Sequence, residues 1–289
     1  MGIIDYWANA FTPDRRTLWH GAIADQDIPL KVRSADDDSF AEPDAMVERM
    51  DEIGIDTLVL PCAIVPEDAD AHAYERYAVQ PEELSALTSA HPGRFVGAAS
   101  FDPTRISAGV RDAQRILDDS PCVALHLHTH SWDRAFDHRD LYPFYALAAE
   151  RGLPVVMQAG ASGGRMPSEC GRPIGIDRPA MFFEETAFVL SHTGWPWVDE
   201  AIAMAQKHHN VYLGTAGYPP HHWPEGLVRF MQGLGRGKTL FGTSFPVVGH
   251  RHALGRLEAL ALKDEAREAL LETTARRVFK TLPAQRGSA

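Results

Sequence analysis

The ten residues Gly2-Ile3-Ile4-Asp5-Tyr6-Trp7-Ala8-Asn9-Ala10-Phe11 open the chain with a short apolar run. A run of this length, placed at the start of a chain, predicts a buried strand. Trp7 and Asn9 lie two residues apart near its far end, so the two-residue period of a strand places both side chains on one side. We therefore expect Trp7 and Asn9 to share one environment where the first strand ends.

Seven further short apolar segments follow, and helix-forming segments separate most of them. The predicted strands are residues 2–11, 56–60, 95–100, 123–128, 154–158, 188–192, 211–214 and 239–242. The predicted helices are residues 42–53, 71–90 with an interruption near Pro81, 107–117, 141–151, 198–208, 223–233, 254–262 and 265–282. This alternation predicts an α/β fold, a parallel (β/α)8 TIM barrel. It forms one domain over residues 1–289, with a frayed tail at 283–289.

The composition indicates a globular protein. The chain has 289 residues, of which 45% are hydrophobic, and its net charge of −11 is scattered along the sequence. An acidic, scattered surface argues against nucleic acid or an anionic membrane as a partner. Cys62, Cys122 and Cys170 are odd in number and far apart, which favours buried thiols in a reducing compartment. Without a signal segment or an apolar run of about 20 residues, we expect a soluble cytoplasmic protein.

Four later segments resemble the amidohydrolase-related family, which includes aminocarboxymuconate-semialdehyde decarboxylase and the resorcylate decarboxylases. They are Gly-Leu-Pro-Val-Val at 152–156, Val-Leu-Ser-His-Thr-Gly-Trp-Pro-Trp at 189–197, Asn-Val-Tyr-Leu at 210–213 and Leu-Phe-Gly-Thr-Ser-Phe-Pro at 240–246. They match the approach to strand five and the motifs of strands six, seven and eight, in order, so the resemblance covers nearly the whole chain. The first strand also resembles the family's opening strand, which usually reads Ile-Asp-x-His-x-His.

The resemblance implies a divalent metal held by two histidines on strand one, a histidine on strand five and an aspartate on strand eight. The matching positions here are Trp7, Asn9, Gln158 and Ser244. An indole N–H, two amides and a hydroxyl are poor ligands for Zn²⁺, which favours imidazole, thiolate and carboxylate. We therefore predict no metal ligands at these positions and no cofactor. These four residues are instead the predicted substrate-binding residues.

Histidines at two strand ends are the predicted catalytic residues. The resemblance places His192 at the end of strand six, beside the substrate, where an imidazole can move a proton or polarise a substrate group. It also places His126 of the His-Leu-His-Thr-His stretch in the site, and alternation puts His128 on the same face at the rim. Arg165, in the Gly/Pro-rich segment 160–179, is predicted to bind a substrate carboxylate. The segment 12–40, with Trp19 and His20, is predicted to be a functional loop or lid.

Three functional hypotheses remain open at this stage. The first is a metal-independent hydrolase or lyase that acts on a small aromatic or unsaturated carbonyl or carboxylate compound by histidine acid–base chemistry. Lactone hydrolysis, decarboxylation, hydration and cyclisation all fit it. The second is a non-catalytic relative that binds a ligand or a partner. The third is a relocated metal site built from His126, His128 and His192. The family resemblance favours a homodimer.

Overall fold

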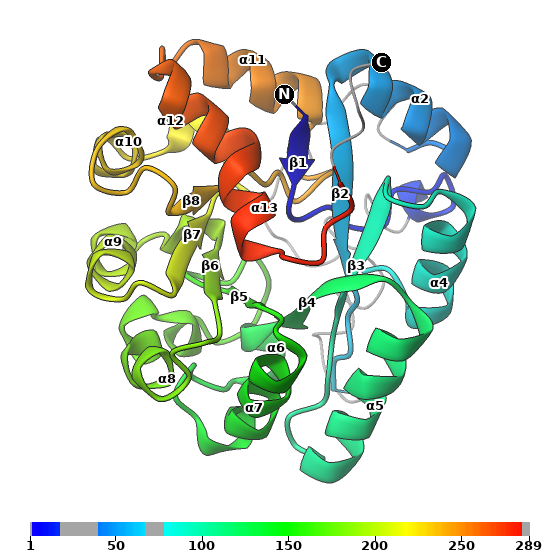
Figure 1. Cartoon of the computed structure of the whole chain (residues 1–289), viewed down its shortest axis with the longest axis vertical. Helices are drawn as coiled ribbons and strands as arrows, with labels where there is room; N and C mark the ends of the chain where they lie inside the picture. The colour runs from blue at the N-terminus through cyan, green and yellow to red at the C-terminus, as the bar shows by residue number, and fades with distance from the viewer. Residues whose placement is uncertain (1, 18–39, 67–77, 285–289) are drawn as a thin grey trace.

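Eight parallel strands form a sheet that curls into a barrel, with helices around the outside (Figure 1). The computed structural model describes residues 2–17, 40–66 and 78–284. Each strand pairs with the next in chain order. The strands are β1 (Ile3–Asp5), β2 (Ile55–Pro61), β3 (Phe95–Ala99), β4 (Cys122–Leu127), β5 (Val155–Gln158), β6 (Phe188–Ser191), β7 (Val211–Gly214) and β8 (Thr239–Leu240). The predicted α/β TIM barrel is therefore confirmed.

The segments that follow β1 and β8 close the barrel. Ser244 N–H donates to the Trp7 carbonyl at 2.9 Å, and Asn9 N–H donates to the Phe245 carbonyl at 2.7 Å. These bonds continue the parallel pairing beyond the last residues of both strands. Closure therefore runs through Trp7, Asn9 and Ser244, three of the four positions that the motif resemblance matches to the family's metal ligands.

Most helices lie close to the predicted ranges. They are α2 (Pro43–Ile53), α4 (Pro81–Ala90), α5 (Ile106–Asp119), α6 (Thr129–Trp132), α7 (Tyr142–Arg151), α8 (Asp177–Phe182), α9 (Val198–Lys207), α10 (Glu225–Gln232), α11 (His250–Glu258), α12 (Asp264–Glu268) and α13 (Thr274–Val278). The helix predicted at 265–282 is continuous from α12 to α13, but it passes through a π-helical turn, Ala269–Thr273, and ends at Val278. The sequence did not predict α6 or α8. Residues 71–77, and most of the predicted loop with Trp19 and His20, lie outside the described residues.

Several strands are shorter than predicted. β1 stops at Asp5, whose carboxylate accepts the Trp7 N–H at 3.0 Å and so withdraws it from the strand ladder. β4 ends one residue before His128, where the chain turns into α6. β6 ends before His192, whose φ of +57° is incompatible with a strand. His128 and His192 therefore lie just past their strands, at the carboxyl-terminal end of the barrel.

Apolar side chains fill the barrel interior, and the C-terminal helix α13 covers the amino-terminal end of the barrel. Ile4, Val59 and Val96 belong to the interior cluster, and so does Phe279, which directly follows α13. Gly2 N–H donates to Glu272 Oε2 at 2.9 Å, which fixes the π-helical turn against the start of β1. In Figure 1, α13 crosses in front of the ring of strands. The amino-terminal end is thereby covered, which leaves the carboxyl-terminal end for a site.

All three cysteines are free, as the sequence predicted, and Cys62 and Cys170 are buried. The helices of the described segments are all too short or too polar to cross a bilayer.

Candidate functional site

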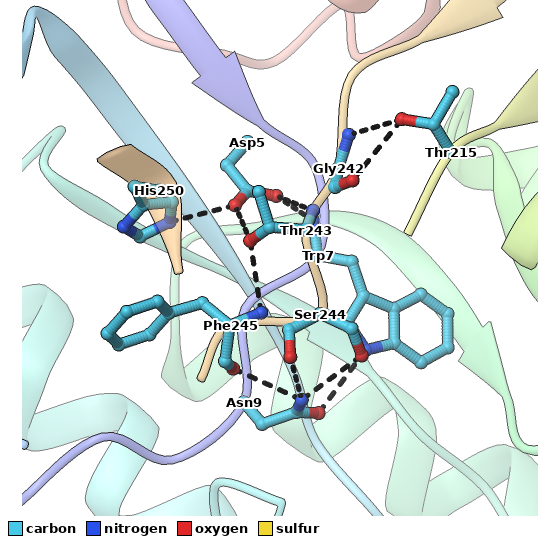
Figure 2. A network of polar contacts seen from close by, with 9 residues as sticks. All are labelled: Asp5, Trp7, Asn9, Thr215, Gly242, Thr243, Ser244, Phe245 and His250. Atoms are coloured by element: carbon cyan, nitrogen blue, oxygen red, sulfur yellow. Dashed lines mark hydrogen bonds and ion pairs between the residues drawn. The ribbon is translucent and has the colours of Figure 1, made fainter. Parts of the chain in front are cut away.

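Three side chains at the seam between β1 and the β8 end bind one another (Figure 2). Trp7 Nε1 donates to Asn9 Oδ1 at 3.2 Å, so the two residues share one environment, as their spacing predicted. Asn9 Nδ2 lies 3.0 Å from the Ser244 carbonyl, 3.3 Å from its hydroxyl and 3.2 Å from the Phe245 carbonyl. Both ends of the Asn9 amide are thus engaged within the protein.

Asp5 forms a second network next to this seam (Figure 2). Its Oδ1 accepts N–H bonds from Trp7 at 3.0 Å and from Thr243 at 3.1 Å. Its Oδ2 accepts the Thr243 hydroxyl at 2.5 Å and lies 3.0 Å from Nε2 of His250. Asp5 is completely buried, so these four partners replace its hydration. The network fixes both segments that carry the seam residues.

The Trp7 indole lies between two imidazoles. Its ring centroid is 4.7 Å from that of His126 and 5.0 Å from that of His192, and both contacts are edge-on. Trp7 is 1% exposed. The indole therefore fills the space between the strand-four and strand-six histidines.

Three histidines, His126, His128 and His130, alternate along the end of β4, and each has a polar partner. His126 Nδ1 lies 2.9 Å from the Cys62 carbonyl, and His130 Nε2 lies 2.9 Å from the Gly160 carbonyl. Because a carbonyl only accepts, each of these nitrogens carries the proton. His128 Nδ1 lies 2.5 Å from the Ser131 hydroxyl. All three imidazoles are buried.

His192 differs from these three because the residue as a whole is half-buried, while the other three are buried. Its Nδ1 lies 2.6 Å from the hydroxyl of the buried Ser191. His192 and Thr193 have φ of +57° and +56°, a left-handed conformation that is rare for non-glycine residues and concentrated at functional sites. This turn places the imidazole against Gly217, where an added Cβ would lie 2.7 Å from His192 Cδ2.

The local environment keeps the imidazoles uncharged. Burial lowers the pKa of His126 to about 4, and its hydrogen bond to Cys62 opposes this only in part. Burial lowers the pKa of His192 to about 3, with a further contribution from His130 and His126 nearby. The pKa values of His128 and His130 are also lowered, again chiefly by burial. At neutral pH the site is therefore a cluster of neutral imidazoles.

The two remaining predicted residues lie after or at the end of β5. Gln158 is its last residue and is buried, and its Oε1 has no hydrogen-bond partner among the described residues. Arg165 is exposed in the following segment. Its neighbour Met166 accepts a weak bond from the Ser131 hydroxyl at 3.6 Å, which brings this segment to the edge of the histidine cluster. The structure brings Arg165 near the site but not into the seam.

The family's metal does not fit the residues present. The Asn9 amide is satisfied by the seam, and the Trp7 indole fills the adjacent space. Among the residues described, no group of three or more His, Cys, Asp and Glu side chains is placed to hold an ion. That finding covers the grouping of His126, His128 and His192, so the relocated metal site gains no support.

Sequence reasoning overlooked Asp5, His250, Tyr6 and Ser191. Asp5 and Ser191 carried a signal, because each is a polar residue within an apolar strand. His250 carried none, since its partner lies 245 residues away. The only sign of Tyr6 is the absence of a side chain at Gly214 and Gly242. An added Cβ at these positions would lie 2.1 Å and 2.3 Å from the Tyr6 side chain.

The polar side chains of this TIM barrel gather at the carboxyl-terminal end of its strands. In TIM-barrel enzymes, the active site lies at this end. The model of the amidohydrolase family matches residues 4–281, and the chain belongs to that family. No protein in a curated collection matches the chain.

Solved structures share the whole fold at low sequence identity. An uncharacterised TIM-barrel protein from Bordetella bronchiseptica is 23% identical, with a TM-score of 0.79 over 98% of this chain and 99% of that one. For 5-carboxyvanillate decarboxylase from Sphingomonas paucimobilis the identity is 16% and the TM-score 0.66, over 96% and 99%. For a probable 2-pyrone-4,6-dicarboxylic acid hydrolase from Acinetobacter baumannii they are 13% and 0.61, over 97% and 100%.

Proposed function

We propose that the protein is a metal-independent hydrolase or lyase, in which His192 acts on a carbonyl or carboxylate group of a small aromatic or unsaturated substrate. One observation carries the proposal. Of the four histidines in this cluster, His192 is the one residue that is half-buried, while His126, His128 and His130 are buried. It lies at the carboxyl-terminal end of β6, where TIM-barrel enzymes place catalytic groups.

The chemistry follows from an imidazole that stays neutral. Such a group can hydrogen bond to a substrate carbonyl oxygen and can take or give one proton as bonds to that carbon change. In lactone hydrolysis, a water oxygen would bond to the acyl carbon, the ring C–O bond would break, and the released oxygen would take a proton. The buried His126 and His128 would act on His192 and its surroundings. The Trp7, Asn9 and Ser244 side chains of the seam would form one wall of the site.

Two solved relatives favour ring compounds that bear carboxyl groups. Their names specify a carboxyvanillate decarboxylase and a pyrone dicarboxylic acid hydrolase. We infer a substrate of the same size class, with lactone hydrolysis and decarboxylation as the leading reactions. Arg165 would bind a substrate carboxylate from the segment after β5, because a guanidinium makes paired bonds to a carboxylate.

A binding protein without catalysis is the second candidate, and the burial of Trp7 favours it. An indole that is 1% exposed and flanked by His126 and His192 leaves less room for a substrate than a metal site would. On this hypothesis the chain binds a small aromatic ligand without converting it. The predicted homodimer is compatible with either function and is checked by light scattering of the purified protein.

The test is turnover of a panel of lactones and aromatic acids by protein purified without chelator, with metal content measured on the same sample. We expect turnover that a chelator does not change and that falls at least about 100-fold in His192→Gln, since general acid–base groups contribute that much. The matched control is His222→Gln, on an exposed turn, which should keep full activity. Activity that vanishes with chelator would refute metal independence. Binding without turnover would favour the second candidate.

A further inference from the structure

The Trp7 indole reaches across the carboxyl-terminal end of the barrel, from the segment after β1 to the ends of β4 and β6. Its ring centroid lies 4.7 Å from that of His126, on β4, and 5.0 Å from that of His192, which follows β6. In the sheet, β5 lies between β4 and β6. The indole therefore lies over the carboxyl-terminal end of β5.

Gln158 is the last residue of β5 and points toward the space that the indole fills. Val156, two residues earlier, belongs to the same interior cluster as Trp7, and strand alternation directs Gln158 to the same side. Gln158 also pairs in register with Ser191, the last residue of β6. Trp7, His126 and Gln158 therefore border one space at this end of the barrel.

Two buried acceptor atoms on this border lack a hydrogen-bond partner. His126 donates its Nδ1 proton to the Cys62 carbonyl at 2.9 Å, so Nε2 of the neutral ring is a bare acceptor. His126 Nε2 and Gln158 Oε1 are both buried, and neither has a partner among the residues that the structure describes. Trp7 cannot be that partner, because the single N–H of its indole donates to Asn9. Since a buried unpaired acceptor costs free energy, the packed indole leaves two favourable bonds unmade.

We propose that the Trp7 indole fills a ligand subsite, and that a small ring compound enters this space with an O–H or N–H donor toward His126 Nε2 and Gln158 Oε1 when the indole swings out. The inference rests on the proposed function for the size class of the ligand. The two acceptor atoms offer lone pairs and no proton, so they pair with a hydroxyl or amino group and gain nothing from a carboxylate. A carboxylate on the same ligand would point outward, toward Arg165.

The movement of Trp7 follows from what the ligand gains. One side-chain hydrogen bond, 3.2 Å to Asn9, holds the indole where it is. A ligand that pairs both acceptors makes bonds that the closed arrangement lacks, and this difference in affinity shifts the side chain outward. The indole then forms a wall of the site beside the space it has left.

The experiment compares aniline with toluene, two rings of nearly the same size of which only aniline has N–H donors. Trp7→Ala opens the space, and calorimetry measures the affinity for each probe. We expect aniline to bind at least about tenfold more tightly than toluene, as one added hydrogen bond allows. Adding Gln158→Leu to Trp7→Ala should reduce this preference. Trp195→Ala, which removes an exposed indole, should bind both probes as the unchanged protein does.

The ¹⁵N signals of the His126 side chain, assigned by their absence in His126→Gln, report the contact itself. Aniline should shift the Nε2 signal of Trp7→Ala, and toluene should not. Equal affinity for the two probes, no binding of either, or a His126 signal that aniline does not move would overturn the inference.

If Trp7→Ala fails to fold, the unchanged protein decides. Aniline should then move the indole N–H signal of Trp7, assigned by its absence in Trp7→Phe, and a signal that stays in place would count against the subsite. None of these readouts needs turnover. A protein that binds aniline in this way and converts no substrate would refute the proposed enzyme and leave the subsite standing.

Discussion

The His250 imidazole lies 3.0 Å from the Asp5 carboxylate, and both side chains are almost fully buried between β1 and α11. The His250 ring also stacks on Phe245, with ring centroids 4.3 Å apart and planes 5° from parallel. Asp5 in turn receives the Thr243 N–H and hydroxyl. One carboxylate therefore ties the start of the chain to the segment after β8, across the seam that closes the barrel.

Removing the charge of Asp5 should destabilise the fold. Asp5→Asn keeps the shape but places an N–H₂ group where one of two oxygens now accepts hydrogen bonds, and it removes the partner of His250. Breaking a buried pair in this way costs about 3 kcal/mol. Urea unfolding measures the change in the free energy of unfolding.

The matched control is the exposed pair of Arg251 and Glu52, only 2.6 Å apart. Glu52→Gln should cost less than about 1 kcal/mol, because solvent screens an exposed pair. An Asp5→Asn variant as stable as Glu52→Gln would show that the buried network does not hold the seam.

The close packing of Gly214 against Tyr6 predicts opposite outcomes for two glycine substitutions. In Gly214→Ala the new Cβ would lie 2.1 Å from Tyr6 Oη. Overpacking of this kind costs about 1–3 kcal/mol, and the cost should shrink when Tyr6 is also replaced by leucine. Gly255→Ala in α11 meets nothing within 4 Å, so it should stabilise by about 0.5–1 kcal/mol. Thermal unfolding compares the melting temperatures of Gly214→Ala and Gly255→Ala. Equal changes in the two variants would contradict the close packing of Gly214 against Tyr6.

The barrel could be predicted because buried parallel strands and amphipathic helices have different periods. Metal independence was inferred from the residue types at motif positions, and it stays a prediction. The shared environment of Trp7 and Asn9 also followed from spacing, although β1 ends before both. Local periodicity thus located the strands and one edge of the site.

The remaining site depends on contacts between distant segments. Asp5 reads as a buried strand residue until His250 is brought beside it by the closed barrel. Alternation extended the β4 strand to His128, but the chain turns into α6 there, and the side chain bonds to Ser131. Strand periodicity stops applying where a strand ends, which is where this site lies.

Truncating Trp7 should open a cavity between two imidazoles. Trp7→Ala should lower the free energy of unfolding by about 3–5 kcal/mol, as for other large-to-small core changes. Added indole should restore part of the melting temperature, because a ligand that binds only the folded state stabilises it. Trp195→Ala is the control, since Trp195 is 49% exposed. This variant should show neither the loss of stability nor the stabilisation by indole. No response of Trp7→Ala to indole would show that the space collapses.

The buried imidazoles should make the fold sensitive to acid. The pKa of His126 is about 4 in the folded protein, against about 6.5 when unfolded. Between these pH values the unfolded chain binds a proton that the folded chain does not, so stability is lost as pH falls from 6.5 toward 4. His126 alone accounts for about 3 kcal/mol of this loss.

His126→Gln should therefore reduce the pH dependence by up to one proton, measured by urea unfolding at several pH values. His209→Gln, on the surface, should leave the slope unchanged. A slope that His126→Gln does not alter would mean that His126 is protonated within the folded protein.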